Sequence, residues 1–269
     1  MTDTEIENTL DTRVGLTIDK AKVPVLTYHS IDDSGSIIST PPRIFRQQMR
    51  TIKDLGLKAL SLKQLSHSLR AQKPIEPNSV VLTFDDGFAN FYTEAFPTLQ
   101  ENGLTATVFL VAGHCGGYND WTGNPPKLPR SKVLSWEQIR EISDAGIDFG
   151  SHTLSHPDLC RLTADKAETE IEVSKKVIED SIGRPVESFA YPFGHFNANV
   201  RRLVEEFYGS ACSTIMGKVT SKSDLHALER VDTYYLSSPR TFGLLSTKAM
   251  DSYIALRGTL RIIKAAVAG

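Results

Sequence analysis

Segments typical of buried strands alternate with helical segments along most of this chain of 269 residues. The strand-like segments are short, apolar and rich in β-branched and aromatic residues, and most are followed by apolar residues at helical spacing. Because parallel strands need a crossover between them, repeated units of this kind predict a parallel α/β sheet. The predicted strands are residues 23–28, 58–60, 80–84, 105–111, 147–151, 188–191 and 210–214.

A parallel sheet of this kind either closes into a barrel or stays open. Several predicted strands end on side chains that can carry chemistry, and barrel enzymes build their sites from the loops after the strands. This favours a (β/α) barrel; an open doubly wound sheet obeys the same rule and is the alternative. Residues 1–21 are polar and weakly patterned, so we expect a loose N-terminal arm before one catalytic domain over residues 22–269.

The first chemical motif is a pair of carboxylates at a strand end. Asp85 and Asp86 follow the apolar run 80–84 and precede Gly87, which supplies a turn. Successive strand residues point to opposite faces, so the two carboxylates can work together only where the strand ends and the backbone turns. The pair could instead cap the following helix, since aspartate is a good N-cap residue.

Two histidines four residues apart form the second motif. His152 and His156 follow an apolar run that contains Ile147 and Phe149. Two imidazoles and one carboxylate can hold a divalent metal and leave coordination positions open. The second carboxylate is then free to act as a base, which predicts a metal-dependent hydrolase. Alone, the histidines could be hydrogen-bonded structural residues; together with the aspartates they favour a metal site.

Composition excludes several classes of partner. A formal net charge of −2 gives no attraction to nucleic acid, and no apolar stretch approaches the length of a membrane span. The first residues have neither a basic start nor an apolar block, which argues against a secretory signal. Cys115, Cys160 and Cys212 form no Cys-x-x-Cys pair and are expected to be reduced. We therefore expect a cytoplasmic protein; the sequence leaves its oligomeric state open.

The two motifs, together with a third, resemble those of the polysaccharide deacetylases, carbohydrate esterase family 4. The matching stretches are residues 83–87, residues 151–157 and, for the family's Arg-x-Pro-Tyr-Gly motif, residues 190–194. The resemblance covers about residues 23–232, and its opening is similar to a branch that includes bacterial poly-N-acetylglucosamine N-deacetylases. It implies a deformed seven-stranded (β/α) barrel, circularly permuted in this branch, which removes N-acetyl groups from aminosugar polymers with a divalent metal, often zinc.

The resemblance also implies a role for each motif residue. Asp85 would be the general base that activates the attacking water, and the backbone N–H of Phe193 would help to bind the tetrahedral oxyanion. The implied metal ligands are Asp86, His152 and His156. Amide hydrolysis needs a polarised carbonyl, an activated water and a proton for the departing amine. The metal and Asp85 cover the first two of these needs.

Two positions depart from the family pattern. Ala190 stands where many members have an arginine that orients the base. Arg230 is the candidate replacement, and a plain surface salt bridge is the alternative for it. The usual C-terminal Leu-x-His that supplies the general acid is not evident. In the related branch a histidine near the N-terminus takes that role, which points to His29; His226, which follows Leu225, is the rival.

Aromatic residues are candidates for contact with a saccharide. Tyr191, Phe193 and Trp121 could form a wall on which sugar rings stack, although aromatics at strand ends are more often core. Trp121 is the leading candidate, because it lies in segment 116–130, whose turn formers predict a long functional loop. The C-terminal segment from Thr247 is predicted to form an amphipathic helix packed on the barrel.

The sequence therefore predicts a metal-dependent hydrolase that removes N-acetyl groups from aminosugar oligo- or polysaccharides or their precursors. Its expected partner is an N-acetylated saccharide. Another amide on the same fold, such as an N-formyl sugar or a small cyclic amide, is the alternative substrate class. A non-catalytic saccharide-binding protein with a relict site is the third hypothesis, which the intact motif residues disfavour.

Overall fold

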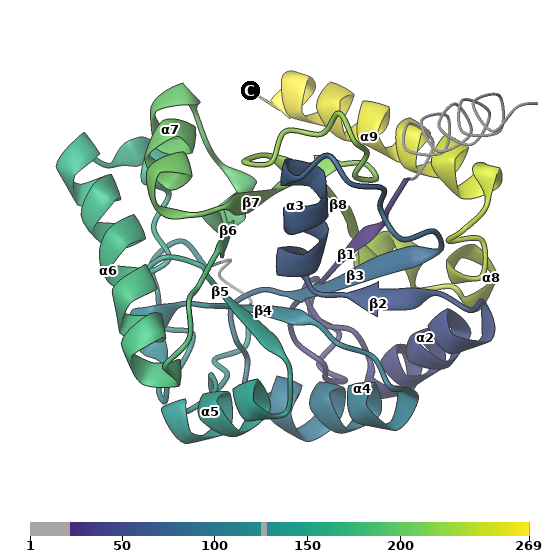
Figure 1. The fold of residues 1–269 in the computed structure, drawn as a ribbon, viewed down its shortest axis with the longest axis horizontal. Coiled ribbons are helices and arrows are strands. Elements are labelled where there is room, and N and C mark those ends of the chain that lie inside the picture. The colour runs from purple at the N-terminus through teal and green to yellow at the C-terminus, as the bar shows by residue number, and fades with distance from the viewer. Residues whose placement is uncertain (1–21, 125–127, 269) are drawn as a thin grey trace, which may run out of the picture.

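A closed barrel of parallel strands forms the centre of the protein (Figure 1). A computed structural model describes residues 22–124 and 128–268; the predicted N-terminal arm, residues 1–21, lies outside them. The sheet order is β1–β8–β7–β6–β5–β4–β3–β2, and β1 also pairs with β3, so seven strands close into a ring. The predicted barrel is confirmed, and the open sheet is wrong. The strands are β1 (Val25–Tyr28), β2 (Lys58–Leu60), β3 (Ser79–Phe84), β4 (Thr107–Leu110), β5 (Asp148–Ser151), β6 (Ser188–Ala190), β7 (Ser210–Met216) and β8 (Leu228–Asp232).

Burial of the central strands explains their continuous apolar sequences. All residues of β1 and β3 are buried, as expected for parallel strands that are covered on both faces. The two strands pair in register from Val25 opposite Val81 to Tyr28 opposite Phe84. Because both strands run in the same direction and end together, the residues that follow Tyr28 and Phe84 emerge side by side at one end of the barrel.

Helices surround the ring and are fixed by local sequence signals. Ser61 and Ser135 each accept a hydrogen bond from the backbone N–H three residues later, and a glutamine at that position reaches back, which completes a capping box. The helices are α2 (Pro42–Asp54), α3 (Leu62–Arg70), α4 (Phe96–Asn102), α5 (Trp136–Asp144), α6 (Ala164–Ile182), α7 (Ala198–Phe207), α8 (Pro239–Phe242) and α9 (Lys248–Ala268).

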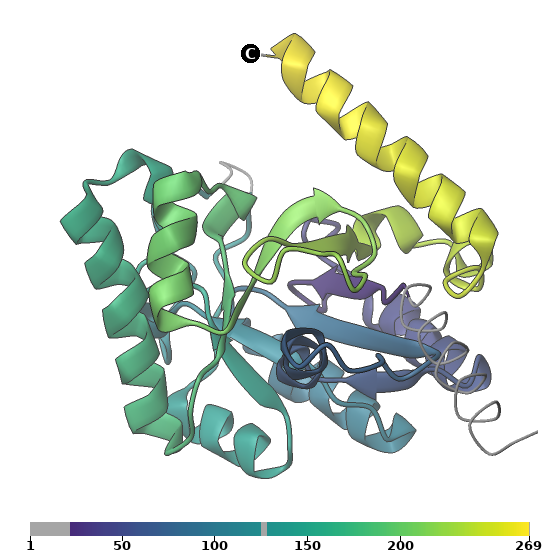
Figure 2. The same ribbon diagram turned by 45° about the horizontal axis from the view of Figure 1, so that its top comes forward.

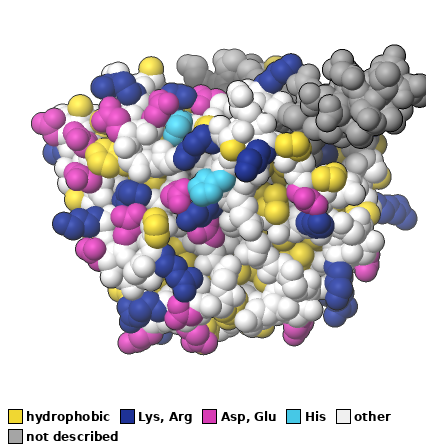
Figure 3. All heavy atoms as spheres, in the orientation of Figure 1, with side chains coloured by type: hydrophobic (Ala, Val, Ile, Leu, Met, Phe, Trp, Pro, Cys, Tyr) yellow, Lys and Arg dark blue, Asp and Glu magenta, His cyan; other side chains and the backbone are white. Residues whose placement is uncertain are grey.

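Helix α3 lies across the amino-terminal ends of several strands and is seen at the front of Figure 1. The backbone N–H of Leu62 donates to the hydroxyl of Thr107 at the start of β4. Arg70 donates to the carbonyl of Gly209, directly before β7. Cationic and anionic side chains are interspersed on this face (Figure 3), in keeping with the nearly balanced charge of the chain. The opposite end of the barrel, where the strands finish, is left for the site.

A π-helical turn, Phe91–Ala95, lies between β3 and α4 and leads directly into α4. The backbone N–H of Phe96 bonds to the carbonyl of Phe91, five residues earlier. Pro97 follows and has no backbone N–H, so it cannot make the next helical hydrogen bond. The wider turn accommodates this missing bond. Such π turns often lie at functional sites, and this one begins directly after Asn90.

Helix α9 packs on the barrel through its first turns. Met250 and Ile254 are buried, whereas Leu256, Leu260 and Ile263 are largely exposed. Figure 2 shows the rest of the helix extending away from the barrel. The prediction that the whole segment packs on the barrel is therefore only partly correct. No helix within residues 22–124 and 128–268 is long and apolar enough to cross a membrane.

Candidate active site

Asp85 is buried at the carboxyl end of β3 and is held by an arginine. Arg230, which lies in β8, donates to both carboxylate oxygens, with Nη1–Oδ1 at 2.7 Å and Nη2–Oδ2 at 2.8 Å. The Arg230 Nε donates to the Ser213 carbonyl at 2.9 Å, and Nη1 lies 3.3 Å from the Thr83 hydroxyl. These contacts fix the plane of the guanidinium, and the bidentate pair fixes that of the carboxylate. Arg230 is therefore a buried partner of Asp85 and not part of a surface salt bridge.

Arg230 decides the charge state of Asp85. Burial alone would raise the pKa of the Asp85 carboxyl, but the attraction and hydrogen bonds of Arg230 outweigh burial and hold this pKa well below its ordinary value. The carboxylate in turn raises the pKa of Arg230, against the effect of burial. Asp85 is therefore an anion at neutral pH.

Three further side chains converge beside this pair. The Nε2 atoms of His152 and His156 each lie 3.5 Å from Oδ1 of Asp86 and 3.2 Å from one another. Asp86 follows β3, and His152 follows β5. One ligand atom from each of these three residues lies within 4.8 Å of the other two, a set that could hold a metal ion.

The surroundings of the two imidazoles suit a metal. His152 Nδ1 lies 2.7 Å from the carbonyl oxygen of Ala190, which can only accept. A neutral His152 therefore carries its proton on Nδ1 and turns the lone pair of Nε2 toward Asp86. Burial lowers the pKa of His156 to about 2, so this ring is neutral. Two imidazoles and a carboxylate fit a divalent cation.

The backbone is strained at several of these positions. Asp86, His156 and Phe193 have positive φ values of 72°, 59° and 58°, in the region that favours glycine. The intervening Thr153 is also in this region, with φ of 69°. Residues held in such conformations cluster at active sites, where the surrounding structure keeps them in place. The strain therefore marks the same rim of the barrel as the titratable groups do.

His29 lies on this rim, directly after β1. Its Nε2 is 3.9 Å from Oδ2 of Asp85, and its side chain is about one quarter exposed, at 26%. His226 lies elsewhere, before the start of β8, where its Nε2 contacts the Tyr208 carbonyl at 3.0 Å. Tyr208 in turn precedes β7. The structure thus brings His29 to the carboxylate and places His226 at the amino-terminal end of the strands.

The three aromatic residues predicted to contact a saccharide differ in their exposure. Phe193 is 37% exposed, and its ring centroid lies 4.7 Å from that of His156, so it can face a ligand. Trp121 is only 5% exposed and packs against His156 and His114. Tyr191 is 1% exposed and donates its hydroxyl to the His226 carbonyl. Both side chains are buried, and their contacts with a saccharide stay predictions.

Sequence reasoning missed some of the residues that build the site. Gly123 permits the close approach of the Phe193 ring, since a Cβ at this glycine would lie 2.9 Å from Phe193 Cζ. Gly123 also has a φ of 97°. In the sequence, only its place in a glycine-rich loop pointed to Gly123, and this did not indicate that it packs against Phe193.

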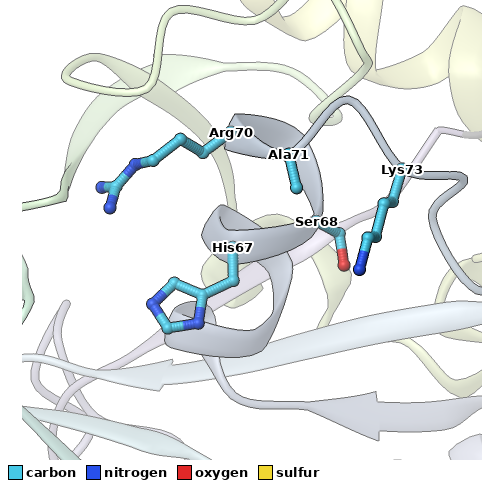
Figure 4. Close-up of a pocket in the computed structure, with 5 residues that line it drawn as sticks. All are labelled: His67, Ser68, Arg70, Ala71 and Lys73. Atoms are coloured by element: carbon cyan, nitrogen blue, oxygen red, sulfur yellow. The ribbon is translucent and has the colours of Figure 1, made fainter.

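A surface hollow of about 510 Å³ lies on α3, away from these residues. Figure 4 shows its lining, which consists of His67, Ser68, Arg70, Ala71 and Lys73. His67 contacts Glu187 at 2.6 Å, and Glu187 directly precedes β6. The hollow is therefore at the amino-terminal end of the strands and takes no part in the site around Asp85.

Known proteins are similar to this chain in sequence and fold. The sequence profile of the polysaccharide deacetylase family matches residues 72–208. The chain is 30% identical over 224 residues to YxkH of Bacillus subtilis, whose name classes it with these deacetylases; the match covers 83% of this chain and 75% of YxkH. It is 28% identical over 141 residues to the poly-beta-1,6-N-acetyl-D-glucosamine N-deacetylase of Escherichia coli K12, which is 48% of this chain but 20% of that enzyme.

A solved deacetylase structure has a similar fold over most of the chain. The Streptococcus pyogenes deacetylase PplD, solved in complex with acetate, aligns with a TM-score of 0.74 and 27% sequence identity. The alignment covers 84% of this chain and 98% of PplD. Given the extent of the profile match and the likeness to YxkH, the chain belongs to the polysaccharide deacetylase family, whose members hydrolyse N-acetyl amide bonds.

Proposed function

We propose that this protein is a metal-dependent hydrolase that removes N-acetyl groups from aminosugar oligo- or polysaccharides or their precursors. The observation that carries the proposal is the placement of one ionised carboxylate, Asp85. It lies beside the cluster of Asp86, His152 and His156, and 3.9 Å from the His29 imidazole. An anion that can accept a proton thus stands next to three metal-ligating atoms and to a group that can donate a proton.

Asp86, His152 and His156 are the proposed metal ligands. Two imidazoles and one carboxylate form a common ligand set of catalytic zinc sites, so zinc is the expected ion. A divalent metal held there supplies Lewis acidity, which polarises the amide carbonyl and stabilises negative charge on its oxygen. The hydrogen bond from His152 to the Ala190 carbonyl orients the imidazole for this role.

The remaining residues handle protons and charge. Asp85 accepts a proton from the attacking water, and Arg230 keeps the carboxylate ionised and oriented. The backbone N–H of Phe193 donates to the oxygen of the tetrahedral intermediate. His29 donates a proton to the departing amine, which is a poor leaving group without it. In this scheme the base and the acid come from adjacent strands, β3 and β1, whose ends lie side by side.

The substrate class is inferred from the relatives and from one exposed ring. The E. coli relative acts on poly-beta-1,6-N-acetyl-D-glucosamine, according to its name, and PplD was solved with acetate, the product of deacetylation. Phe193 presents an exposed aromatic face next to His156, on which the apolar face of a sugar can stack. An N-acetylated aminosugar in a chain of sugars fits both observations.

Acetate release from a panel of acetylated sugars tests this function. The zinc-loaded protein should release acetate from N-acetylglucosamine oligomers of β-1,6 or β-1,4 linkage. Formate release from N-formyl sugars without acetate release would favour the alternative amide hydrolase. Saccharide binding without any hydrolysis by the metal-loaded protein would favour a binding protein and would reject the proposal.

Removal of one metal ligand should lower metal occupancy. We expect His152→Ala, His156→Ala and Asp86→Ala each to reduce bound metal, because each deletes one of three protein ligands. Elemental analysis of purified variants measures this. His67→Ala, which changes a histidine on α3, is the matched control and should keep the wild-type stoichiometry. Unchanged metal content in all three ligand variants would reject the assignment.

Loss of the arginine should change the pH dependence of activity. In Arg230→Gln, burial of Asp85 is no longer opposed by a cation, so its pKa should rise. A base that protonates at higher pH loses activity earlier as pH falls, so the acid limb of the kcat/KM profile should move upward by about 1–3 pH units. Metal content measured at each pH separates this effect from metal loss. An unmoved acid limb would show that Arg230 does not control the ionisation of Asp85.

A further inference from the structure

Hydrogen bonds hold the chain on both sides of His29, and the segment that carries Asp85 supplies them. On the amino-terminal side, the backbone N–H of Asp85 donates to the Tyr28 carbonyl at 2.9 Å. On the carboxyl-terminal side, the backbone N–H of Ile31 donates to the Asn90 side-chain oxygen at 3.1 Å. Asn90 lies only five residues after Asp85, just before the π-helical turn. His29 is thus fixed to the same short stretch of chain that carries the carboxylate.

The Asn90 amide makes further contacts with the segment after His29. Its Nδ2 donates to the Ser30 hydroxyl at 2.6 Å and lies 3.4 Å from Oδ2 of Asp32. The Ser30 hydroxyl in turn donates to Asp32. One planar group therefore contacts three consecutive residues, numbers 30 to 32, through its acceptor and its donor.

Asp32 anchors this network as an anion. Its Oδ1 accepts from the backbone N–H of Ser34 at 2.8 Å. Burial alone would raise the pKa of Asp32, but hydrogen bonds from Ser30, Ser34 and Ser39 outweigh it and hold this pKa below its ordinary value. The loop after His29 is therefore organised around a carboxylate that stays ionised, and Asn90 ties that loop to the segment after β3.

We infer that Asn90 is a positioning residue that sets the place of His29 relative to Asp85. The inference rests on the proposed function, in which His29 is the acid and Asp85 the base. Among the hydrogen bonds and ion pairs recorded for the described residues, the His29 ring has the 3.9 Å contact with Asp85 and no shorter one. Its position therefore depends on its backbone, which Asn90 and Asp85 hold together with the backbone bonds of Ser30 to Ile38 and Thr40. Proton transfer requires close placement, and a displacement of about 1 Å can cost about 10²-fold in rate.

An amide is the group that these contacts require. Aspartate at position 90 could still accept from Ile31, but it could not donate to Ser30 and would place a second carboxylate next to Asp32. Alanine would make none of the three contacts. Neither change touches Asp86, His152 or His156, so the metal site should be unaffected.

The test is the effect of Asn90→Ala on kcat, KM and metal content. We expect kcat on N-acetylglucosamine oligomers to fall by roughly 10- to 100-fold, with KM changed less than about 3-fold and metal content unchanged. Asn102→Ala is the matched control, since the Asn102 amide donates to the Thr98 carbonyl within its own helix, α4. It should leave kcat unchanged. If Asn90→Ala fails to fold, Asn90→Asp replaces it, because it keeps the size of the side chain and the acceptor for Ile31, while it loses the donor to Ser30 and adds a carboxylate next to Asp32.

A double-mutant cycle distinguishes positioning of His29 from a general structural role. If Asn90 acts through His29, Asn90→Ala should have no further effect on kcat in a His29→Ala background. An equal loss of kcat in both backgrounds, or an Asn90→Ala variant with wild-type kcat, would overturn the inference. If His29→Ala itself keeps wild-type kcat, the assignment of the acid fails, and with it the inference. A wild-type protein that hydrolyses none of the sugars rejects the proposed function instead.

Discussion

Asp85→Asn is expected to keep its metal and lose at least ~10²-fold in kcat, the usual range for removal of a general base. The amide is nearly isosteric with the carboxylate but cannot accept a proton at neutral pH. Elemental analysis and acetate release on the same preparation measure both halves of the prediction. The large effect follows from the separation of roles within the pair, since Asp86 contacts the two histidines and Asp85 contacts Arg230.

The same substitution should also weaken the buried ion pair. Arg230 donates through two nitrogens to two carboxylate oxygens, whereas asparagine offers one acceptor and one donor group. One N–H of the buried guanidinium therefore loses its partner, and the cation loses its counter-ion. We expect a lower midpoint of denaturant unfolding for the metal-loaded variant, because an unpaired buried charge is destabilising.

Asp86→Asn is the matched control for Asp85→Asn. It should lose metal as well as activity, because a neutral amide is a poorer ligand than a carboxylate. If Asp85→Asn lost the metal and Asp86→Asn retained it, the roles of the two residues would have to be exchanged. Wild-type turnover in Asp85→Asn would show that another group activates the water.

Much of the site could be predicted because each motif sits directly after a strand. The apolar run before Asp85 marks β3, and the run before His152 marks β5, so a parallel barrel must bring their ends to one rim. The positive φ values of Asp86 and His156 could not be predicted, since neither residue type requires them. Asp86 adopts its value where the chain turns just after β3, and His156 adopts its value within the loop that follows β5.

Strand β8 escaped prediction for a chemical reason. An apolar run predicts a buried strand, but Leu228–Asp232 contains Glu229, Arg230 and Asp232. Arg230 can lie inside the barrel only because Asp85, far away in sequence, neutralises it. The pairing of the two residues was suggested by the alanine at position 190, where many family members have arginine. The burial of the pair required the three-dimensional structure.

The burial of Trp121 and Tyr191 could not be predicted, because the polarity of a loop says little about its individual side chains. Segment 116–130 is rich in turn formers, yet Tyr118 pairs with Lys132 in a β-bridge and brings the loop back onto the barrel. Trp121 is thereby buried against His156. For Tyr191, β6 ends at Ala190, so strand alternation no longer fixes where the next side chain points.

His29→Ala is expected to retain its metal and bind substrate while kcat falls by ~10²–10⁴-fold. Cleavage of the C–N bond expels an amine, which leaves only if it is protonated. His29 can supply that proton because its Nε2 lies 3.9 Å from Asp85 and its ring is partly exposed to an incoming substrate. A general acid works only when protonated, so wild-type kcat should fall as pH rises, and His29→Ala should lose this alkaline limb.

His226→Ala is the matched control and should be nearly silent in the same assays. Its ring is bonded to the Tyr208 carbonyl at the amino-terminal end of the strands, so it cannot reach an amide held near Asp85. Measurement of kcat against pH for both variants, with metal content determined in parallel, decides between the two histidines. If His226→Ala were inactive and His29→Ala active, the acid would come from the C-terminal side of the chain. The proposal that this barrel takes its acid from the end of β1 would then be rejected.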